Sequence, residues 1–178
     1  MDPSRTITAV VAALGIAGLA AACSSSPSTT SGTEHFSSVL HGQAALGNSF
    51  TLTYTGPVNT TGSFSTSGPA PTPGQEKAFD TKAGTLELKV DKVPVNTQNG
   101  NPTTCAFKAD TVVDYTVVGS KSTGKFAGAS GSGTVTAIFT GTGPRLSNGK
   151  CNESNSAQPI ASTAYASFVG AGPLTVSS

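Results

Sequence analysis

Apolar and polar side chains alternate along much of the chain, and this pattern is the main indication of its fold. A period of two places every second side chain on the same face of a β-strand, so each such segment is expected to be a strand with one buried face. Glycines and prolines stand in the gaps between these segments. The predicted strands lie at residues 49–55, 86–91, 110–119, 134–140 and 162–169, with 174–176 as a continuation of the last.

The strands predict an all-β domain over residues 48–178, built as an antiparallel β-barrel or, alternatively, as a two-sheet β-sandwich. The Ser/Thr/Pro-rich stretch at 65–74 is expected to be a long loop within it. With many Gly, Ser and Thr residues and 11% charged residues, the composition agrees with a β-rich exported protein.

The segment before this domain shows a different pattern. Residues 24–33 are Ser, Thr, Pro and Gly, which bury little surface, so we expect a disordered tether. Phe36, Val39, Leu40 and Ala44 then recur at helical spacing, with Thr33 available as an N-cap and Gly47 as a stop. This spacing predicts a short amphipathic helix between the tether and the barrel.

The first 22 residues have the organisation of an export signal. Arg5 precedes an uncharged, mostly apolar run at 7–22, which is shorter than the roughly 20 residues that a membrane-spanning helix needs. The run ends in Leu-Ala-Ala-Ala before Cys23, and three serines follow. A secretory signal cleaved after Ala-x-Ala, with Cys23 left as a free thiol, is the simpler alternative.

This boundary resembles the lipobox of bacterial lipoproteins of the actinobacterial type, although Ala20 stands where Leu or Val is usual. The resemblance implies removal of residues 1–22 and acylation of Cys23 by diacylglycerol and a further chain such as palmitate. Two or more chains suffice for stable anchoring. The protein is then expected on the extracytoplasmic face of the cell membrane, with residues 23–47 as a linker.

The other two cysteines, Cys105 and Cys151, are expected to form a disulfide, because paired thiols in an exported chain usually oxidise. Closing a loop of this length stabilises the fold by about 4 kcal/mol in the chain-entropy treatment. The alternative, a metal site with two thiolates, lacks nearby partner ligands in the sequence.

The balance of charge excludes several classes of partner. Removing Asp2 and Arg5 with the signal leaves nine basic and eight acidic residues, and neither sign is clustered. Nucleic-acid binding requires a basic stripe, and electrostatic membrane binding requires a polybasic surface. We therefore expect no nucleic-acid partner, and contact with the membrane only through the lipid at Cys23.

A glycine-rich stretch carries a second family resemblance. Residues 117–120 (Val-Val-Gly-Ser) and 123–131 (Thr-Gly-Lys-Phe-Ala-Gly-Ala-Ser-Gly) resemble the strand–turn–strand signature of allene oxide cyclase and dirigent barrels, with Lys121 and Ser122 as a two-residue insertion. The resemblance implies a barrel fold. The glycines permit positive φ in a tight hairpin, and Phe126 is expected to plug one end of the barrel. No catalytic residue of either family has a match here.

Nucleotide motifs are absent on closer inspection. Residues 119–125 begin like a phosphate-binding loop, but Phe126 stands where a Ser or Thr should hold Mg²⁺, and no helix is predicted to follow. The dinucleotide-like glycines at 128–133 lack a surrounding βαβ unit. We expect no cofactor.

The histidines offer neither a metal site nor a catalytic base. On the predicted helix, His35 and His41 would point about 240° apart. We expect both histidines to be solvated and to lie outside the barrel, so no metal site is expected and a Ser-His-Asp or Cys-His arrangement has no base.

Paired carboxylates are the remaining catalytic candidates. Asp110 and Asp114, and likewise Glu87 and Asp91, are four residues apart, which on a strand is roughly 13 Å and too far for a glycosidase pair. Charges that alternate along a strand usually mark its solvated face. Asp114 lies among apolar residues and is the one acid with a potential catalytic role if it is buried.

Two hypotheses of function follow. The first is a membrane-anchored, non-enzymatic binding or interaction module of the cell envelope, with a small apolar ligand or an envelope protein as partner. The second is a cyclase or isomerase that acts on a small apolar ligand in the barrel lumen, since small barrels can hold one such molecule. A deep apolar pocket with a buried acid favours the enzyme, and a lumen filled by side chains excludes it. A purely structural role in the envelope is a third possibility.

Overall fold

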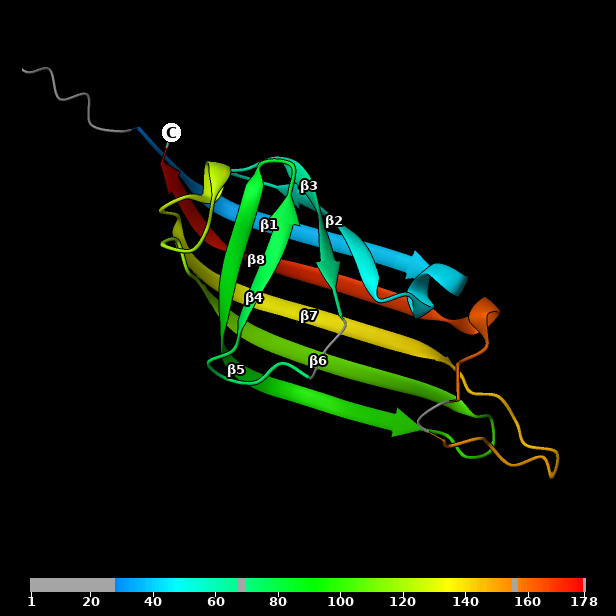
Figure 1. The fold of residues 1–178 in the computed structure, drawn as a ribbon. Coiled ribbons are helices and arrows are strands. Elements are labelled where there is room, and N and C mark those ends of the chain that lie inside the picture. The colour runs from blue at the N-terminus through cyan, green and yellow to red at the C-terminus, as the bar shows by residue number, and fades with distance from the viewer. Residues whose placement is uncertain (1–27, 67–69, 155–156, 178) are drawn as a thin grey trace, which may run out of the picture.

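The computed structural model describes residues 28–66, 70–154 and 157–177. The predicted signal peptide and Cys23 lie outside the described residues. The described chain forms eight strands, each antiparallel to its neighbours in sequence, and β8 closes the barrel against β1 (Figure 1). The predicted all-β fold with an antiparallel barrel is confirmed. The strands are β1 (Thr29–His41), β2 (Ser49–Thr55), β3 (Thr60–Ser65), β4 (Glu76–Thr81), β5 (Gly84–Gly100), β6 (Ala106–Val117), β7 (Ser130–Thr142) and β8 (Tyr165–Ser177).

The barrel has a long wall and a short wall. Strands β5 to β8 and β1 contain 12 to 17 residues each and form the long wall, whereas β2, β3 and β4 contain only six or seven and form the short wall. Figure 1 shows the long strands continuing well past the short ones at one end. The barrel is therefore closed all round over part of its length and open on one side beyond it.

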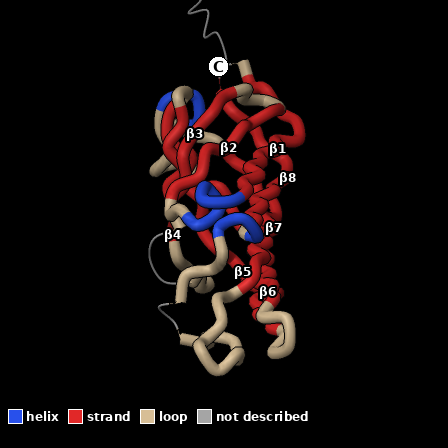
Figure 2. The backbone as a smooth tube through the Cα atoms, turned by 90° about the vertical axis from the view of Figure 1, so that its right-hand side faces the viewer, coloured by secondary structure: helices blue, strands red, loops and turns tan. Residues whose placement is uncertain are grey.

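Three of the connections between the described strands contain a 3₁₀ turn. The turns η1 (Gly42–Leu46) and η3 (Ala161–Thr163) lie against each other, and η2 (Gly124–Phe126) lies toward the other end of the barrel (Figure 2). Under η1 and η3, a small apolar cluster forms around Phe50. The ring of Phe50 lies 4.6 Å from that of Phe168 on β8.

Strand β1 overturns the prediction of a helix before the barrel. It begins at Thr29, inside the predicted tether, and pairs with β8 from Thr29↔Ser177 to His41↔Tyr165. The barrel thus starts near residue 29 and not at 48. The helical spacing misled because Val39, counted with the apolar face, is 54% exposed on the outside of the strand. Buried Glu34 and Ser38 hid the true period of two.

The connection between β6 and β7 closes one end of the barrel. It is a twelve-residue loop around η2 and not the predicted tight hairpin, because β6 ends at Val117 and β7 begins at Ser130. Phe126 is fully buried within the main core, as predicted for a residue that plugs the end. We call this region, with Val58, Ala129, Leu174 and Val176 around Phe126, the closed end.

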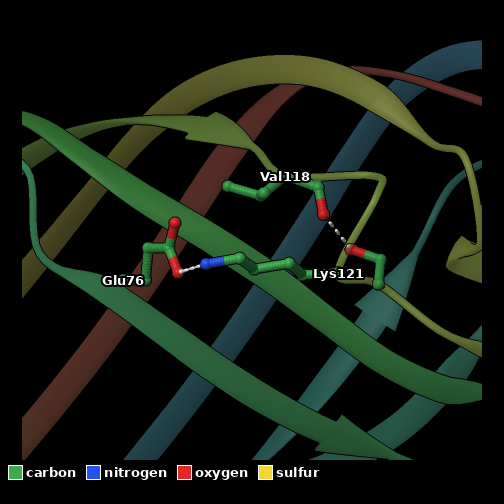
Figure 3. Close-up of polar contacts among 4 residues, drawn as sticks. Glu76, Val118 and Lys121 are labelled. Atoms are coloured by element: carbon green, nitrogen blue, oxygen red, sulfur yellow. Dashed lines mark hydrogen bonds and ion pairs between the residues drawn. The ribbon is translucent and has the colours of Figure 1, made fainter.

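Lys121 and Ser122, the two residues interpreted from the sequence as an insertion, attach this loop to the short wall and to β5. Lys121 forms an ion pair with Glu76 of β4, and the Ser122 hydroxyl donates a hydrogen bond of 3.1 Å to the Val118 carbonyl (Figure 3). The same hydroxyl accepts a hydrogen bond from the Glu87 N–H, 3.0 Å away. The ion pair raises the pKa of Lys121 through its hydrogen bond to Glu76.

The opposite end carries the predicted disulfide. Cys105, just before β6, is bonded to Cys151 in the loop between β7 and β8, with a Cα–Cα distance of 5.4 Å. Arg145 supports this loop by donating to the Gly149 carbonyl at 2.7 Å and to the Thr103 carbonyl. We call this region the disulfide end; it lies beyond the short wall, where the long wall stands alone.

Candidate functional site

The barrel lumen contains a cavity of about 300 Å³ between the closed end and the open side. Its walls are mostly apolar and come from both the short wall and the long wall. This volume is at the lower end of the range for small-molecule sites, about 300–1,000 Å³. The principal wall residues are Phe36, Leu52, Phe79, Leu88, Val113 and Val135.

The cavity opens where the short wall ends. Ser65, Thr66, Ala70 and Pro71, from the connection between β3 and β4, lie at this mouth together with Lys77 of β4. We call the whole space the lumen cavity and this rim its mouth. The lumen is therefore neither filled by side chains along its whole length nor open at both ends.

Four aromatic rings form a layer at the floor of the lumen cavity, and three of them, Phe36, Phe79 and Tyr115, line the cavity itself. Phe36 lies in the middle of this ring layer, with its centroid 5.6 Å from Tyr54, 6.0 Å from Phe79 and 6.1 Å from Tyr115. Two glycines make room for it. A Cβ at Gly170 would lie 2.1 Å from the Phe36 ring, and one at Gly133 would lie 2.5 Å from the Tyr115 hydroxyl.

A buried acid, Glu34, lies just beyond the ring layer. It is one inward position closer to the closed end than Phe36, and only 3% of it is exposed. Its Oε2 accepts a hydrogen bond from the Val58 N–H at 2.9 Å, while Oε1 has no partner among the described residues. Burial raises the pKa of Glu34, and the hydrogen bond from Val58 opposes part of that rise.

Two tyrosines share the environment of this acid. Burial raises the pKa of Tyr54 and that of Tyr115, the latter to about 12, and the negative charge of Glu34 adds to both shifts. The Tyr54 hydroxyl, like Glu34 Oε1, has no hydrogen-bond partner among the described residues. Tyr115 lines the lumen cavity, whereas Glu34 and Tyr54 are not among its lining residues.

The sequence suggested a different acid, Asp114, as the catalytic candidate. Asp114 lies on the outer face of β6, where its carboxylate accepts a 3.1 Å hydrogen bond from the Thr134 hydroxyl. Its inward neighbours Val113 and Tyr115 line the lumen cavity, and Asp114 does not. The condition set for Asp114, burial in the barrel, is not met, because strand alternation turns its half-buried side chain to the outer face.

The other carboxylates behave as expected for a solvated face. Asp110 forms an ion pair of 2.9 Å with Lys108, and Asp91 forms one of 3.7 Å with Lys89. Glu87 is half-buried on the outer face. Burial is the main cause that raises the pKa of Glu87, and the nearby negative charge of Glu76 raises it further. These groups do not converge on the lumen cavity.

The two histidines belong to a strand of the barrel, contrary to prediction, and their side chains lie on its outer face. His35 and His41 both belong to β1 and are exposed. An even spacing of six on a strand points both outward, roughly 20 Å apart, so the predicted angle of 240° is wrong because no helix forms. His41 contacts only Tyr165 as a ring partner among the described residues, at 5.1 Å.

Within the described part of the chain, no group of three or more His, Cys, Asp or Glu side chains could hold a metal ion. No helix in that part is long and apolar enough to cross a bilayer. Comparisons of the chain with models of protein families, with curated proteins and with solved structures find no match. The candidate site therefore rests on the geometry of the lumen cavity, the ring layer and Glu34.

Proposed function

We propose that this protein is a lipid-anchored binding protein of the cell envelope whose barrel holds one small, largely apolar molecule in the lumen cavity. The observation that carries the proposal is the cavity itself, about 300 Å³, walled by aromatic and aliphatic side chains and open at one mouth. Apolar surface of this kind gains free energy when a ligand displaces water from it.

Binding can be tested with phenylnaphthylamine, a neutral dye that fluoresces in apolar sites. Ala137 lines the cavity from β7, so Ala137→Phe fills part of the space. We expect this variant to bind the dye at least about tenfold more weakly, a loss of ~1.4 kcal/mol.

The matched control is Ile138→Phe, one residue away on the outer face of the same strand, which should leave dye affinity unchanged. Equal dye affinities for the native protein, Ala137→Phe and Ile138→Phe would contradict binding in the lumen.

An enzyme of the cyclase or isomerase kind is the second candidate, and Glu34 is the observation that favours it. A buried carboxyl with a raised pKa and one unpartnered oxygen is suited to proton transfer. It would reach a ligand only past Tyr115 and Phe36, which line the cavity floor. This separation favours the binding function.

The test of the enzyme is to incubate envelope lipid extract with the native protein or with Glu34→Gln and compare the small molecules by mass spectrometry. A product formed by the native protein and missing with Glu34→Gln would establish the enzyme. Identical extracts would exclude it for the compounds present.

The anchor at Cys23 has its own test. In a bacterial host that matures lipoproteins, we expect the native chain in the membrane fraction and Cys23→Ser in the soluble fraction. The intact mass of the membrane form should include a diacylglyceryl group on Cys23. A native chain that begins at Cys23 with a free thiol would support the ordinary secretory signal instead.

A further inference from the structure

The lumen cavity has one charged side chain among the described residues that line it, and that residue is Lys77. Strand alternation explains its position. Lys77 pairs with Leu88 across β4 and β5, and both side chains face inward, as does Phe79 two residues later. The neighbouring acids of β4, Glu76 and Asp80, face the other way and lie exposed. No acidic side chain of β4 therefore faces the lumen cavity beside the ammonium group of Lys77.

The acidic side chains on the surrounding elements also do not pair with Lys77. They form ion pairs with other lysines or lie away from the lumen cavity. The three ion pairs in the described part of the chain use Lys89, Lys108 and Lys121, and none uses Lys77. Glu87 of β5 lies on the outer face opposite Ala78. Glu34 is beyond the ring layer and outside the cavity lining.

A lysine at the rim of an apolar space keeps its alkyl stem against the wall and its ammonium group near water. Lys77 is half-buried, which agrees with this arrangement. A ligand that fills the cavity would bring its outer end to the ammonium. An anionic group there gains attraction, whereas a cationic group is repelled.

We propose that the lumen cavity takes an apolar molecule with a single anionic group, its apolar body between Phe36 and Val135 and its anion beside Lys77 at the mouth. This inference rests on the proposed binding function and specifies the charge and orientation of the ligand. It accounts for one inward-facing lysine in a wall whose other described residues are apolar or uncharged polar.

The experiment compares two dyes with nearly the same aromatic body, neutral phenylnaphthylamine and anionic anilinonaphthalene sulfonate. For the native protein in low salt we expect the anionic dye to bind about fivefold more tightly than the neutral one, as for an ion pair near water. Rising ionic strength should reduce this ratio. In Lys77→Met the preference should disappear while the neutral dye still binds.

Lys82→Met is the matched control, because it removes the same charge from the exposed turn between β4 and β5. It should keep the native preference. A preference unchanged in Lys77→Met, or absent from the native protein while Ala137→Phe still blocks both dyes, would overturn the role of Lys77 but leave the binding function intact. Failure of the neutral dye to bind at all, or binding that Ala137→Phe does not weaken, would instead refute the proposed function. Lys77→Gln, a polar replacement, serves if the Met variant does not fold.

Discussion

The closed end and the open half of the barrel are built from the same alternating strands but are packed in different ways. At the closed end, Phe126 is fully buried and Val58 and Leu174 are 2–3% exposed. In the open half, Phe64, Val135 and Phe168 are only partly buried and border the lumen cavity. Tight packing leaves no space for a ligand. Under the proposed binding function, the closed end therefore contributes stability and the open half holds the ligand.

The two ends of the long wall are also held by different means. The closed end relies on its aromatic and aliphatic core, whereas the disulfide end, which extends beyond the short wall, relies on the Cys105–Cys151 bond. A cross-link stabilises mainly by restricting the unfolded chain and needs no large core around it. This makes it suitable for loops that cannot bury much apolar surface.

The largest effect should come from the closed end. Phe126→Ala is expected to cost about 3–5 kcal/mol of unfolding free energy, since it removes a fully buried ring from a packed core. Phe168→Ala, beside the lumen cavity, should cost less, about 1–2 kcal/mol, because its ring is only partly buried. Urea unfolding of both variants measures this difference. Equal losses would show that the two regions are packed alike.

Loss of the disulfide should have the second largest effect on the unfolding free energy. Replacing both Cys105 and Cys151 by Ser is expected to lower the unfolding free energy by up to about 4 kcal/mol. Affinity for the neutral dye should stay near the native value, because neither cysteine lines the lumen cavity. A folded double variant that has lost dye binding would mean that the disulfide end also shapes the cavity.

Glu34 should make the closed end sensitive to pH. Its pKa is raised in the folded protein, so the folded state keeps the proton that the unfolded state releases above about pH 4.5. The stability that this group contributes is fully present below that pH and is lost as the pH rises through the folded pKa. Glu34→Gln keeps an oxygen for the Val58 N–H and removes the titration.

Urea unfolding at about pH 4 and about pH 8 tests this difference. The native protein should lose more stability over that interval than Glu34→Gln. Parallel profiles of the two proteins would contradict a raised pKa at Glu34.

The smallest effect is expected at Asp114. Asp114→Asn should change the unfolding free energy by less than about 0.5 kcal/mol and leave dye affinity as it is, because the residue lies on the outer face. A clear loss of dye binding would show that the outer face of β6 takes part in the site after all.

The strands that the sequence predicted are those in which several apolar residues recur at every second position. β2, β5, β6, β7 and β8 were found in this way, and the Cys105–Cys151 pair was predicted from the expectation that the chain is exported. β3 and β4 were missed because each places a single large apolar residue inward, Phe64 or Phe79, among small and polar residues. One such residue does not define a period.

The candidate site was missed for a related reason. Glu34 directly follows the Ser/Thr/Pro/Gly stretch that has the composition of a tether, and it is an acid at an inward position. Its alternation with Phe36 was the one available signal. Convergence of Glu34, Tyr54 and Tyr115 depends on the pairing of distant strands around the barrel, which local patterns do not determine.

The early start of β1 also determines how the protein would stand on a membrane. Thr29 pairs with Ser177 beside the closed end, while the mouth of the lumen cavity lies at the opposite end of the short wall. Six residues from Cys23 to Thr29 can span at most about 20 Å. With the proposed anchor at Cys23, the closed end would face the lipid headgroups and the mouth would face away. A ligand would then enter from the aqueous compartment and not directly out of the bilayer.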